Sequence, residues 1–359
     1  MSGGHSPVTM QRLGDPSVGG LPAPGVAAFA DALGGFMARA RRVLLTGPID
    51  PDGDSIGACL ALQVGLRHRF PGVTVHVAGT PGYRYDWLQG ADEMVPDDEI
   101  GPDYDLVVVM DGDRHRLEPP IDAAFRSTKW TAIVDHHRST ETDGYDIVLL
   151  DHTAASTCQM VYPLLQLWGV PIDRAVAELL YTGIIFDTGG FRHSNASPAT
   201  HRLAARLLET GVEQAPICVR VLSERSASGL KLLGEVLQQA EVVAEGTVSV
   251  GRITRATFDG LGAQPEDLEG VVDALLHVRG VETACLFIEK RPGIVKLSLR
   301  SRSTVNCADL ARRIGPGGGG HARAAGVILR EPMESVWPRV IAELEAEAAS
   351  CGLVGACAR

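Results

Sequence analysis

Acidic residues and neighbouring histidines stand at the ends of four apolar segments in the first half of the chain. They are Asp50, Asp52 and Asp54 after residues 41–47, Asp111 at the end of 105–111, Asp135, His136 and His137 at the end of 130–135, and Asp187 in the stretch TGIIFDTGGFRH. Carboxylates that lie close together repel one another unless water or a cation screens them. One such aspartate by itself is more often a turn or helix-cap residue, but four groups together indicate a shared ligand.

The residue types in these four groups match a divalent metal centre. Carboxylate oxygens together with an imidazole are ligands of Mn²⁺ or Mg²⁺, and the imidazole favours manganese or another transition ion. Two such ions about 3.5–4 Å apart, with a carboxylate between them, are the usual arrangement for hydrolysing phosphate esters with a metal-bound water. We therefore expect phosphate chemistry that needs no serine or cysteine nucleophile.

The segments that must position these residues are short and almost continuously apolar, which is the pattern of strands covered on both faces. Four strands are predicted, at residues 41–47, 73–79, 105–111 and 130–135. A helical pattern rich in small residues and leucine covers residues 55–70. This alternation predicts an α/β fold with a mostly parallel sheet, and ligands bind such sheets at the carboxyl ends of the strands.

The length of the chain and a change of pattern predict two domains. With 359 residues the chain is long enough for two hydrophobic cores. A tail rich in Gly and Pro, residues 1–25, is expected to be disordered and to precede a first domain over 26–212. A polar helical stretch, 213–245, is expected to connect it to a second domain over 246–350.

Predicted helix caps and strands within each domain support this division. Asp173 and Ser197 are predicted N-caps of two helices in the first domain. Four strands are predicted in the second domain, namely VILR (327–330) and residues 247–254, 281–290 and 293–301. In the last of these, apolar and polar residues alternate, so Arg300 is expected on the polar face. Helical patterns follow, and the second domain is therefore expected to be a smaller α/β unit with a mixed sheet.

Composition restricts the partners of the protein. A formal net charge of −11 argues against a protein that neutralises the many phosphates of long nucleic acid, whereas a small phosphate-bearing ligand is compatible with it. The seven cysteines include no C-x-x-C pair, so neither a disulfide framework nor a zinc knuckle is expected, and a reducing cytoplasm fits best. We expect no membrane-spanning segment.

Five motifs in order resemble the motif set of the DHH phosphoesterases that carry the DHH-associated C-terminal domain. They are PDGD (51–54), the aspartate of VVVMDGD, VDHH (134–137), IIFDTGGFR (184–192) and GGGGHARAAG (317–326). The resemblance covers about residues 40–330. Within that family, the chain is similar to the bacterial oligoribonuclease and pAp phosphatase (nanoRNase) subgroup. The resemblance implies an active site in the cleft between the two domains, and it suggests a homodimer.

The resemblance also implies a site that holds two manganese ions. The residues implied as metal ligands are Asp52, Asp54, Asp111, His136 and Asp187. Four of them would hold one ion, Asp52 would belong to the other, and Asp111 would bridge the two. His137 would lie beside the scissile phosphate as a hydrogen-bond donor or acid, and Asp135 would orient the histidines.

Substrate contacts are implied mainly in the second domain. The residues are Arg116 in the first domain and Gly318, Gly319, Gly320 and His321 in the second. Glycine lets backbone N–H groups approach a phosphate closely, and an imidazole or guanidinium adds positive charge. Arg300 and Arg323 are therefore expected phosphate partners, although simple solvation is an equal alternative for Arg323.

One position departs from the family pattern. The resemblance implies a histidine ligand of the first metal four residues before Asp52, but this chain has Pro48 there, whose side chain has no donor atom. Asp50, two residues further on, lies on the same side of an extended segment. We therefore expect the first metal site to be weakened, filled through Asp50 or a water, or empty until substrate arrives.

The expected function is a manganese-dependent phosphodiesterase or phosphatase of short nucleotides, with Mg²⁺ or another divalent ion as an alternative cofactor. Its substrates would be short oligoribonucleotides, linear dinucleotides of the pApA type or pAp. One alternative is a degenerate nucleotide-binding protein in which Pro48 has removed turnover. Another is an inorganic pyrophosphatase, which shares the N-terminal motifs, but the glycine-rich loop and Arg300 favour a nucleotide.

Overall fold

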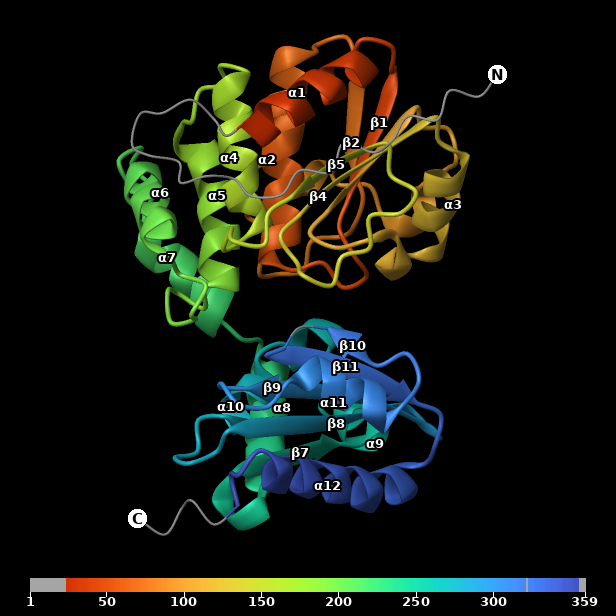
Figure 1. Ribbon diagram of the computed structural model, residues 1–359, viewed down its shortest axis with the longest axis vertical. Helices are drawn as coiled ribbons and strands as arrows, with labels where there is room; N and C mark the ends of the chain where they lie inside the picture. Colours follow the sequence, from red (N-terminus) through yellow and green to blue (C-terminus); the bar gives the residue numbers. More distant parts are fainter. Residues whose placement is uncertain (1–23, 321, 355–359) are drawn as a thin grey trace. The chain divides into compact units, whose positions relative to one another are not determined.

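The computed structural model describes residues 24–320 and 322–354 and divides the chain into two compact units, Met1–Glu224 (unit 1) and Arg225–Arg359 (unit 2) (Figure 1). The tail predicted over residues 1–25 lies outside the described residues up to residue 23, and Pro24 begins the first helix. Among the described helices, none is long and apolar enough to cross a membrane.

Unit 1 is built on a parallel sheet, as the apolar runs predict. Its strands are β1 (Arg42–Thr46), β2 (Thr74–Val77), β3 (Leu106–Met110), β4 (Trp130–Asp135) and β5 (Ile147–Leu150). They lie in the order β2-β1-β3-β4-β5, and every neighbouring pair is parallel. The four predicted strands are confirmed, and β5 is an additional edge strand that the sequence analysis missed.

Helices cover both faces of this sheet, which explains why its strands are apolar along their whole length. The helices of unit 1 are α1 (Pro24–Met37), α2 (Gly53–Arg69), α3 (Pro119–Ser127), α4 (Thr157–Leu167), α5 (Arg174–Asp187), α6 (Pro198–Leu208) and α7 (Gln214–Cys218). On β3, Val108 packs in one core with α1, α2, α4 and α5, whereas Val107 packs in a second core with α3 on the opposite face (Figure 1).

Short helical turns and caps complete unit 1. The 3₁₀ turns are Ala91–Glu93, Asp97–Glu99 and Arg114–Arg116, and a π-helical turn covers Val219–Ser223. The predicted N-caps are confirmed: the Asp173 side chain accepts from Val176 N, and the Ser197 side chain accepts from Thr200 N. Each cap satisfies a backbone donor that the first helical turn leaves without a partner.

Unit 2 contains a mixed sheet of six strands. The strands are β6 (Glu241–Val243), β7 (Val248–Ile253), β8 (Thr283–Arg291), β9 (Ile294–Ser301), β10 (Gly319–Gly320) and β11 (Ala324–Leu329), in the order β10-β11-β9-β8-β7-β6. Only the β7–β8 pair is parallel. The predicted fold class, a parallel-sheet α/β unit followed by a mixed-sheet α/β unit, is confirmed.

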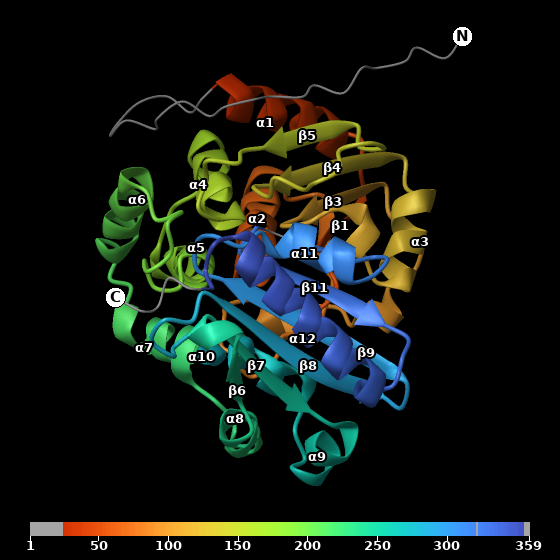
Figure 2. The ribbon, with the colours of Figure 1, turned by 60° about the horizontal axis from the view of Figure 1, so that its bottom comes forward.

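Two cores lie on the two faces of this second sheet. The helices of unit 2 are α8 (Ala227–Gln238), α9 (Arg255–Gly260), α10 (Val271–Leu275), α11 (Cys307–Ile314) and α12 (Met333–Ser350), with a 3₁₀ turn at Pro265–Leu268. One core contains α11 and α12, and Figure 2 shows both in front of the strands. The other contains α8, α9 and α10. On β9, Leu297 and Leu299 are fully buried and Arg300 is half-buried on the other face, as predicted.

The boundary between the units falls between Glu224 and Arg225, within the stretch 213–245. That stretch contains α7, the π-helical turn and α8, but its last residues form β6, which pairs antiparallel with β7. Residues Leu232 and Val236 of α8 are buried in a core of unit 2.

The cysteines differ in burial. Among the described residues six cysteines are free of disulfide bonds. Cys59, Cys158, Cys285 and Cys307 are buried, and burial raises the pKa of each of these thiols. Cys218 in unit 1 and Cys351 in unit 2 are half-buried.

Candidate active site

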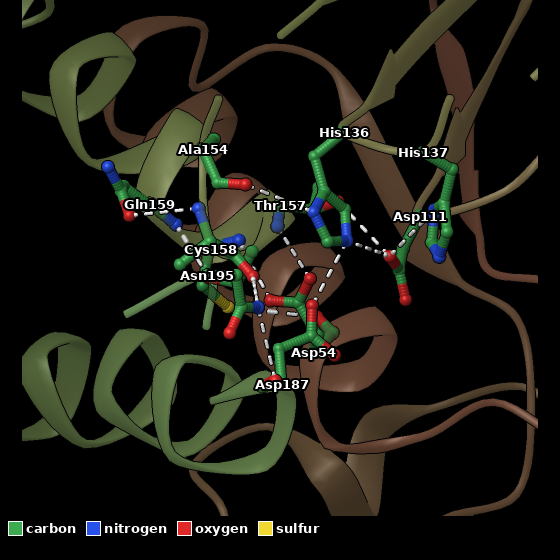
Figure 3. Close-up of polar contacts among 12 residues, drawn as sticks. Asp54, Asp111, His136, His137, Ala154, Thr157, Cys158, Gln159, Asp187 and Asn195 are labelled. Carbon is green, nitrogen blue, oxygen red and sulfur yellow. Dashed lines mark hydrogen bonds and ion pairs between the residues drawn. The ribbon is translucent and has the colours of Figure 1, made fainter. Parts of the chain in front are cut away.

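Four acidic and imidazole side chains of unit 1 converge at the carboxyl edge of the parallel sheet. Asp54 lies in the first turn of α2, Asp111 follows β3, His136 follows β4, and Asp187 is the last residue of α5. One ligand atom from each of these four residues lies within 4.8 Å of the others (Figure 3). The structure therefore brings together four of the five predicted metal ligands.

Asp54 is fully buried and is held by the N-terminus of α4. Its Oδ2 accepts from Thr157 N at 2.5 Å, and its Oδ1 accepts from Cys158 N at 2.9 Å. Burial and the neighbouring carboxylates of Asp111 and Asp187 raise the pKa of Asp54, because each disfavours a further negative charge. The two amide donors partly offset this cost, since a helix N-terminus favours negative charge.

Asp111 adopts the left-handed backbone conformation, with φ 61°, directly after β3. Asp tolerates this conformation better than most residues because its short polar side chain can form local hydrogen bonds. Its Oδ2 accepts from Ser55 Oγ at 2.5 Å and its Oδ1 from Thr157 Oγ1 at 3.2 Å. Burial acts to raise the pKa of Asp111, but the adjacent imidazoles and the Ser55 hydroxyl outweigh it and lower the pKa.

His136 presents one ring nitrogen to the cluster. Its Nδ1 lies 3.3 Å from the carbonyl oxygen of Ala154, and because a carbonyl only accepts, the hydrogen bond places the proton on Nδ1. Nε2 lies 3.0 Å from Asp187 Oδ2 and 3.5 Å from Asp111 Oδ1. Burial acts to lower the pKa of His136, but its contacts with Asp111 and Asp187 outweigh burial and raise it.

Two buried atoms in this cluster are suited to a cation. His136 Nε2 and Asp187 Oδ2 are buried and neither has a partner in hydrogen-bond geometry, although the two atoms are only 3.0 Å apart. Buried polar atoms without hydrogen bonds are uncommon, and an ion is one of the explanations. Three carboxylates with one imidazole form a donor set that suits Mn²⁺ or Mg²⁺, so the residues present fit such an ion.

Asp135 and His137 form a second, adjoining arrangement. Asp135 is fully buried, and its Oδ1 accepts from the backbone N–H groups of His136 and His137 and lies 2.6 Å from His137 Nδ1. Its Oδ2 accepts from the Thr140 hydroxyl. Asp135 thus fixes the backbone of both histidines and the ring of one. Burial acts to lower the pKa of His137, but contacts with Asp135 and Asp111 raise it.

Asp52, the fifth predicted ligand, serves as the N-cap of α2. Its Oδ1 accepts from Asp54 N at 2.9 Å and from Ser55 N at 3.1 Å. Among the described residues a second candidate ligand group consists of Asp111, Asp135, His136 and His137, and neither group includes Asp52. The cap interaction fixes the start of the helix that carries Asp54.

Pro48 is buried in the structure, whereas Asp50 is exposed. Pro48 is buried beside Gly112, where an added Cβ would lie 3.3 Å from Pro48 Cβ. Asp50 is exposed and has a φ of 55°, so the segment is not extended there and Asp50 is outside both candidate ligand groups. Arg116 is also exposed, in the 3₁₀ turn Arg114–Arg116, and its carbonyl accepts from Ile49 N at 2.6 Å.

The remaining predicted residues belong to unit 2. Gly318 packs against the backbone of Ala311 in α11, where a Cβ would overlap the carbonyl, and Gly319 and Gly320 form β10. His321 lies outside the described residues. Arg300 Nε lies 3.1 Å from Asp273 Oδ1, and Arg323 Nη1 donates to the carbonyl of Val305 at 3.3 Å.

Sequence reasoning missed the residues that hold the ligands. Ser55 and Thr157 donate to Asp111. Asn195 Nδ2 donates to the carbonyl of Asp187 at 3.2 Å (Figure 3). A signal was present for Thr157, because Ser156 followed by Thr157 at the start of an apolar run is typical of a helix N-terminus. The sequence did not reveal that this helix begins beside Asp54.

Comparison with known proteins agrees with the fold and the motif order. The DHH family N-terminal domain matches residues 42–184, and the DHHA1 domain matches residues 245–350. The chain is 31% identical over 307 residues to the bifunctional oligoribonuclease and PAP phosphatase NrnA of Thermus thermophilus. The aligned region covers 85% of this chain and 89% of that protein. It is 27% identical to the protein of the same name from Bacillus subtilis, covering 84% and 93%.

A solved structure shares the same architecture. The crystal structure of an exopolyphosphatase-related protein from Bacteroides fragilis superposes with a TM-score of 0.80 at 25% sequence identity, covering 91% of this chain and 98% of that one. The predicted resemblance is confirmed: the chain belongs to the DHH family and carries a DHHA1 domain.

Proposed function

We propose that this protein is a manganese-dependent phosphoesterase that hydrolyses short oligoribonucleotides, linear dinucleotides or pAp. The observation that carries the proposal is the convergence of Asp54, Asp111, His136 and Asp187 within 4.8 Å. The relatives support a nucleotide phosphoesterase, because the two described above are named for action on oligoribonucleotides and PAP. The choice of manganese rests on the imidazole in the donor set.

In this proposal the metal-binding side chains and His137 have different roles. Asp54, Asp111, His136 and Asp187 would hold a divalent ion, and the chemistry that such an ion supplies is polarisation of a phosphoryl oxygen and activation of a water. His137, whose Nδ1 lies 2.6 Å from Asp135 Oδ1, would donate from its other ring nitrogen to a phosphate oxygen.

We further propose that the metal centre is asymmetric. Pro48 occupies a buried position beside Gly112 and provides no donor atom, and Asp50 is exposed. We expect one tightly held ion per chain, with a second bound weakly near Asp52 and Asp111. Elemental analysis of the purified protein and of a Pro48→His variant tests this, since two tightly held ions in the wild type with no gain in the variant would contradict it.

Substrate panels test the activity itself. With Mn²⁺ present, we expect turnover of pAp, pApA, pGpG or RNA of up to about ten nucleotides, and loss of that turnover in Asp111→Ala, because Asp111 contacts both imidazoles. Nucleotide binding without turnover would instead support the degenerate binding protein that Pro48 suggests. Hydrolysis of inorganic pyrophosphate in preference to every nucleotide would support a pyrophosphatase.

The residues that contact the substrate, the cellular compartment and the oligomeric state of the protein are also proposals. Arg116, Arg300, Arg323 and the glycine-rich loop are proposed to bind the phosphates, which predicts that Arg300→Ala raises KM more than it lowers kcat. The cytoplasmic location is proposed from the cysteine pattern, and the homodimer from the family resemblance.

A further inference from the structure

Thr157, the first residue of α4, contacts two of the carboxylates at the centre of the site. Its backbone N–H donates to Asp54 Oδ2 at 2.5 Å, and its hydroxyl donates to Asp111 Oδ1 at 3.2 Å. The side chain is fully buried. Asp54 lies 103 residues and Asp111 lies 46 residues earlier in the chain, so this one residue joins three distant segments.

Ser55 completes the arrangement from the other side of Asp111. Its hydroxyl donates to Asp111 Oδ2 at 2.5 Å, so each oxygen of this carboxylate accepts from a different buried hydroxyl. A carboxylate held at both oxygens cannot rotate freely. Asp111 Oδ1 also faces His136 Nε2 at 3.5 Å and His137 Nδ1 at 3.6 Å, so this held carboxylate oxygen is turned toward the candidate metal group.

These hydrogen bonds matter most when no cation is bound. The buried carboxylates of Asp54 and Asp111 and the half-buried carboxylate of Asp187 then lie beside one another and repel. Hydrogen bonds to ionised groups are among the strongest in proteins, and those from Thr157 and Cys158 hold Asp54 against this repulsion. Partners that orient metal ligands in this way change metal affinity when they are removed.

We propose that Thr157 and Ser55 are positioning residues that hold Asp111, and through the Thr157 amide Asp54, in the geometry that binds a divalent ion. The inference rests on the proposed function, since it assigns a task to these hydroxyls within the same metal centre. It adds two residues, neither acidic nor basic, that set the affinity of the site without contacting the reacting phosphate.

The test compares Thr157→Val, Thr157→Ser and Ser55→Ala in the full-length chain. Valine keeps the backbone N–H and the shape of threonine but removes its hydroxyl, whereas serine keeps both donors. We expect Mn²⁺ to bind about 10- to 100-fold more weakly to Thr157→Val and to Ser55→Ala, measured by isothermal titration of protein stripped of metal. Thr157→Ser is expected to bind close to wild type. The combined Thr157→Val and Ser55→Ala variant should show non-additive losses, because both hydroxyls act on one carboxylate.

Thr182→Val is the matched control. Thr182 is a fully buried threonine in α5 whose hydroxyl donates to the carbonyl of Glu178 in its own helix at 2.8 Å, so its loss removes a buried hydroxyl from unit 1 without touching a ligand. We expect wild-type Mn²⁺ affinity for this variant, and thermal unfolding in EDTA checks that each variant is folded.

The outcomes separate this inference from the proposed function. Folded Thr157→Val and Ser55→Ala proteins that bind Mn²⁺ as tightly as the wild type would overturn the inference alone. A wild-type chain that binds no divalent ion would overturn the proposed function and the inference with it. Equal weakening in Thr182→Val would also contradict the inference, because any buried hydroxyl would then have the same effect.

Discussion

At the scale of single residues, the candidate site depends on how closely main chain and side chains approach one another. Gly183 in α5 shows this most clearly, because an added Cβ would overlap Asp54 Oδ1 and Cys158 Sγ. Both atoms are ends of fully buried side chains, and each already has a contact: Asp54 Oδ1 accepts from Cys158 N, and Cys158 Sγ donates to the carbonyl of Asp54. Gly183 therefore leaves the space that the Asp54 carboxylate occupies, although the two residues lie far apart in the sequence.

We predict that Gly183→Ala lowers Mn²⁺ affinity at least about tenfold, because Asp54 must leave its place between the α4 amides and the other ligands. Isothermal titration measures this directly. Gly35→Ala is the control: it lies in α1 with no atom within 4 Å of the added Cβ, and a helical Gly→Ala change there is expected to add about 0.5–1 kcal/mol of stability. Unchanged affinity in Gly183→Ala would contradict the geometry.

Protonation of the ligands predicts a pH dependence of metal binding. Contacts with Asp111 and Asp187 raise the pKa of His136 despite its burial, and burial raises the pKa of Asp54. Protons bound to these groups must leave when a cation binds, so Mn²⁺ affinity is expected to fall as the pH falls, by about tenfold per pH unit for each proton released. Titrations in two buffers of different ionisation enthalpy measure the released protons. Constant affinity from pH 8 to pH 6 would argue against this assignment.

The sequence predicted the chemistry of single residues better than their contacts. Asp54, Asp111, His136 and Asp187 could be grouped because strand and helix ends of a parallel α/β fold meet at one edge. The N-cap role of Asp52 and the hydroxyls of Ser55 and Thr157 could not be found this way. They depend on where α4 starts in space relative to α2, which no local pattern encodes.

At the scale of elements, the site requires α2 and α5 to pack with almost no side chain between them. An added Cβ on Gly57 of α2 would lie 2.5 Å from the carbonyl oxygen of Leu179 in α5, which is backbone and cannot rotate away. This close approach puts the first turn of α2 beside the last turns of α5. The glycines of these helices therefore serve packing rather than flexibility.

We predict that Gly57→Ala destabilises unit 1 by about 1–3 kcal/mol, because the two helices must separate to admit the methyl group. Chemical denaturation with a probe of unit 1 measures the loss. In contrast to Gly183→Ala, the main effect is expected on stability in EDTA rather than on metal affinity of the folded protein. A variant as stable as the wild type would show that α2 and α5 do not meet as described.

Elements were predictable where apolar runs were long and buried, as in β1, β3 and β4. Two of the elements that differed from expectation are the short edge strands β5 and β6. The four residues of β5 follow a polar loop, and β6 has three residues at the end of a helical stretch. Each is extended because a neighbouring strand pairs with it, and pairing of this kind depends on tertiary structure rather than on local periodicity.

At the scale of the whole molecule, each unit has cores of its own. Among the described residues, two hydrophobic clusters belong to unit 1 and two to unit 2, and no cluster contains residues of both. All four residues of the candidate metal group lie in unit 1. A ligand that binds one unit alone stabilises that unit.

We predict that calorimetry of the full chain shows a separate response of the two units to Mn²⁺. At 100 times its dissociation constant, the ion is expected to add about 2.7 kcal/mol to the free energy of unfolding of unit 1 and nothing to that of unit 2. EDTA should reverse the shift, and Asp187→Ala should abolish it. A single transition that moves as a whole would instead mean that the units unfold together.

The two half-buried cysteines lie in different units, so they provide labelling positions in both. Burial raises the pKa of the four buried thiols, two of which lie close to Asp54 and Asp111, and also that of the half-buried Cys218. The four buried thiols are in addition shielded from alkylating dyes, whereas Cys218 and Cys351 are partly exposed. Once Cys357 is changed to serine, Cys218 and Cys351 provide one labelling position in each unit. A fluorescent donor and acceptor at these two thiols would measure whether the distance between the two units changes when Mn²⁺ or a nucleotide is added.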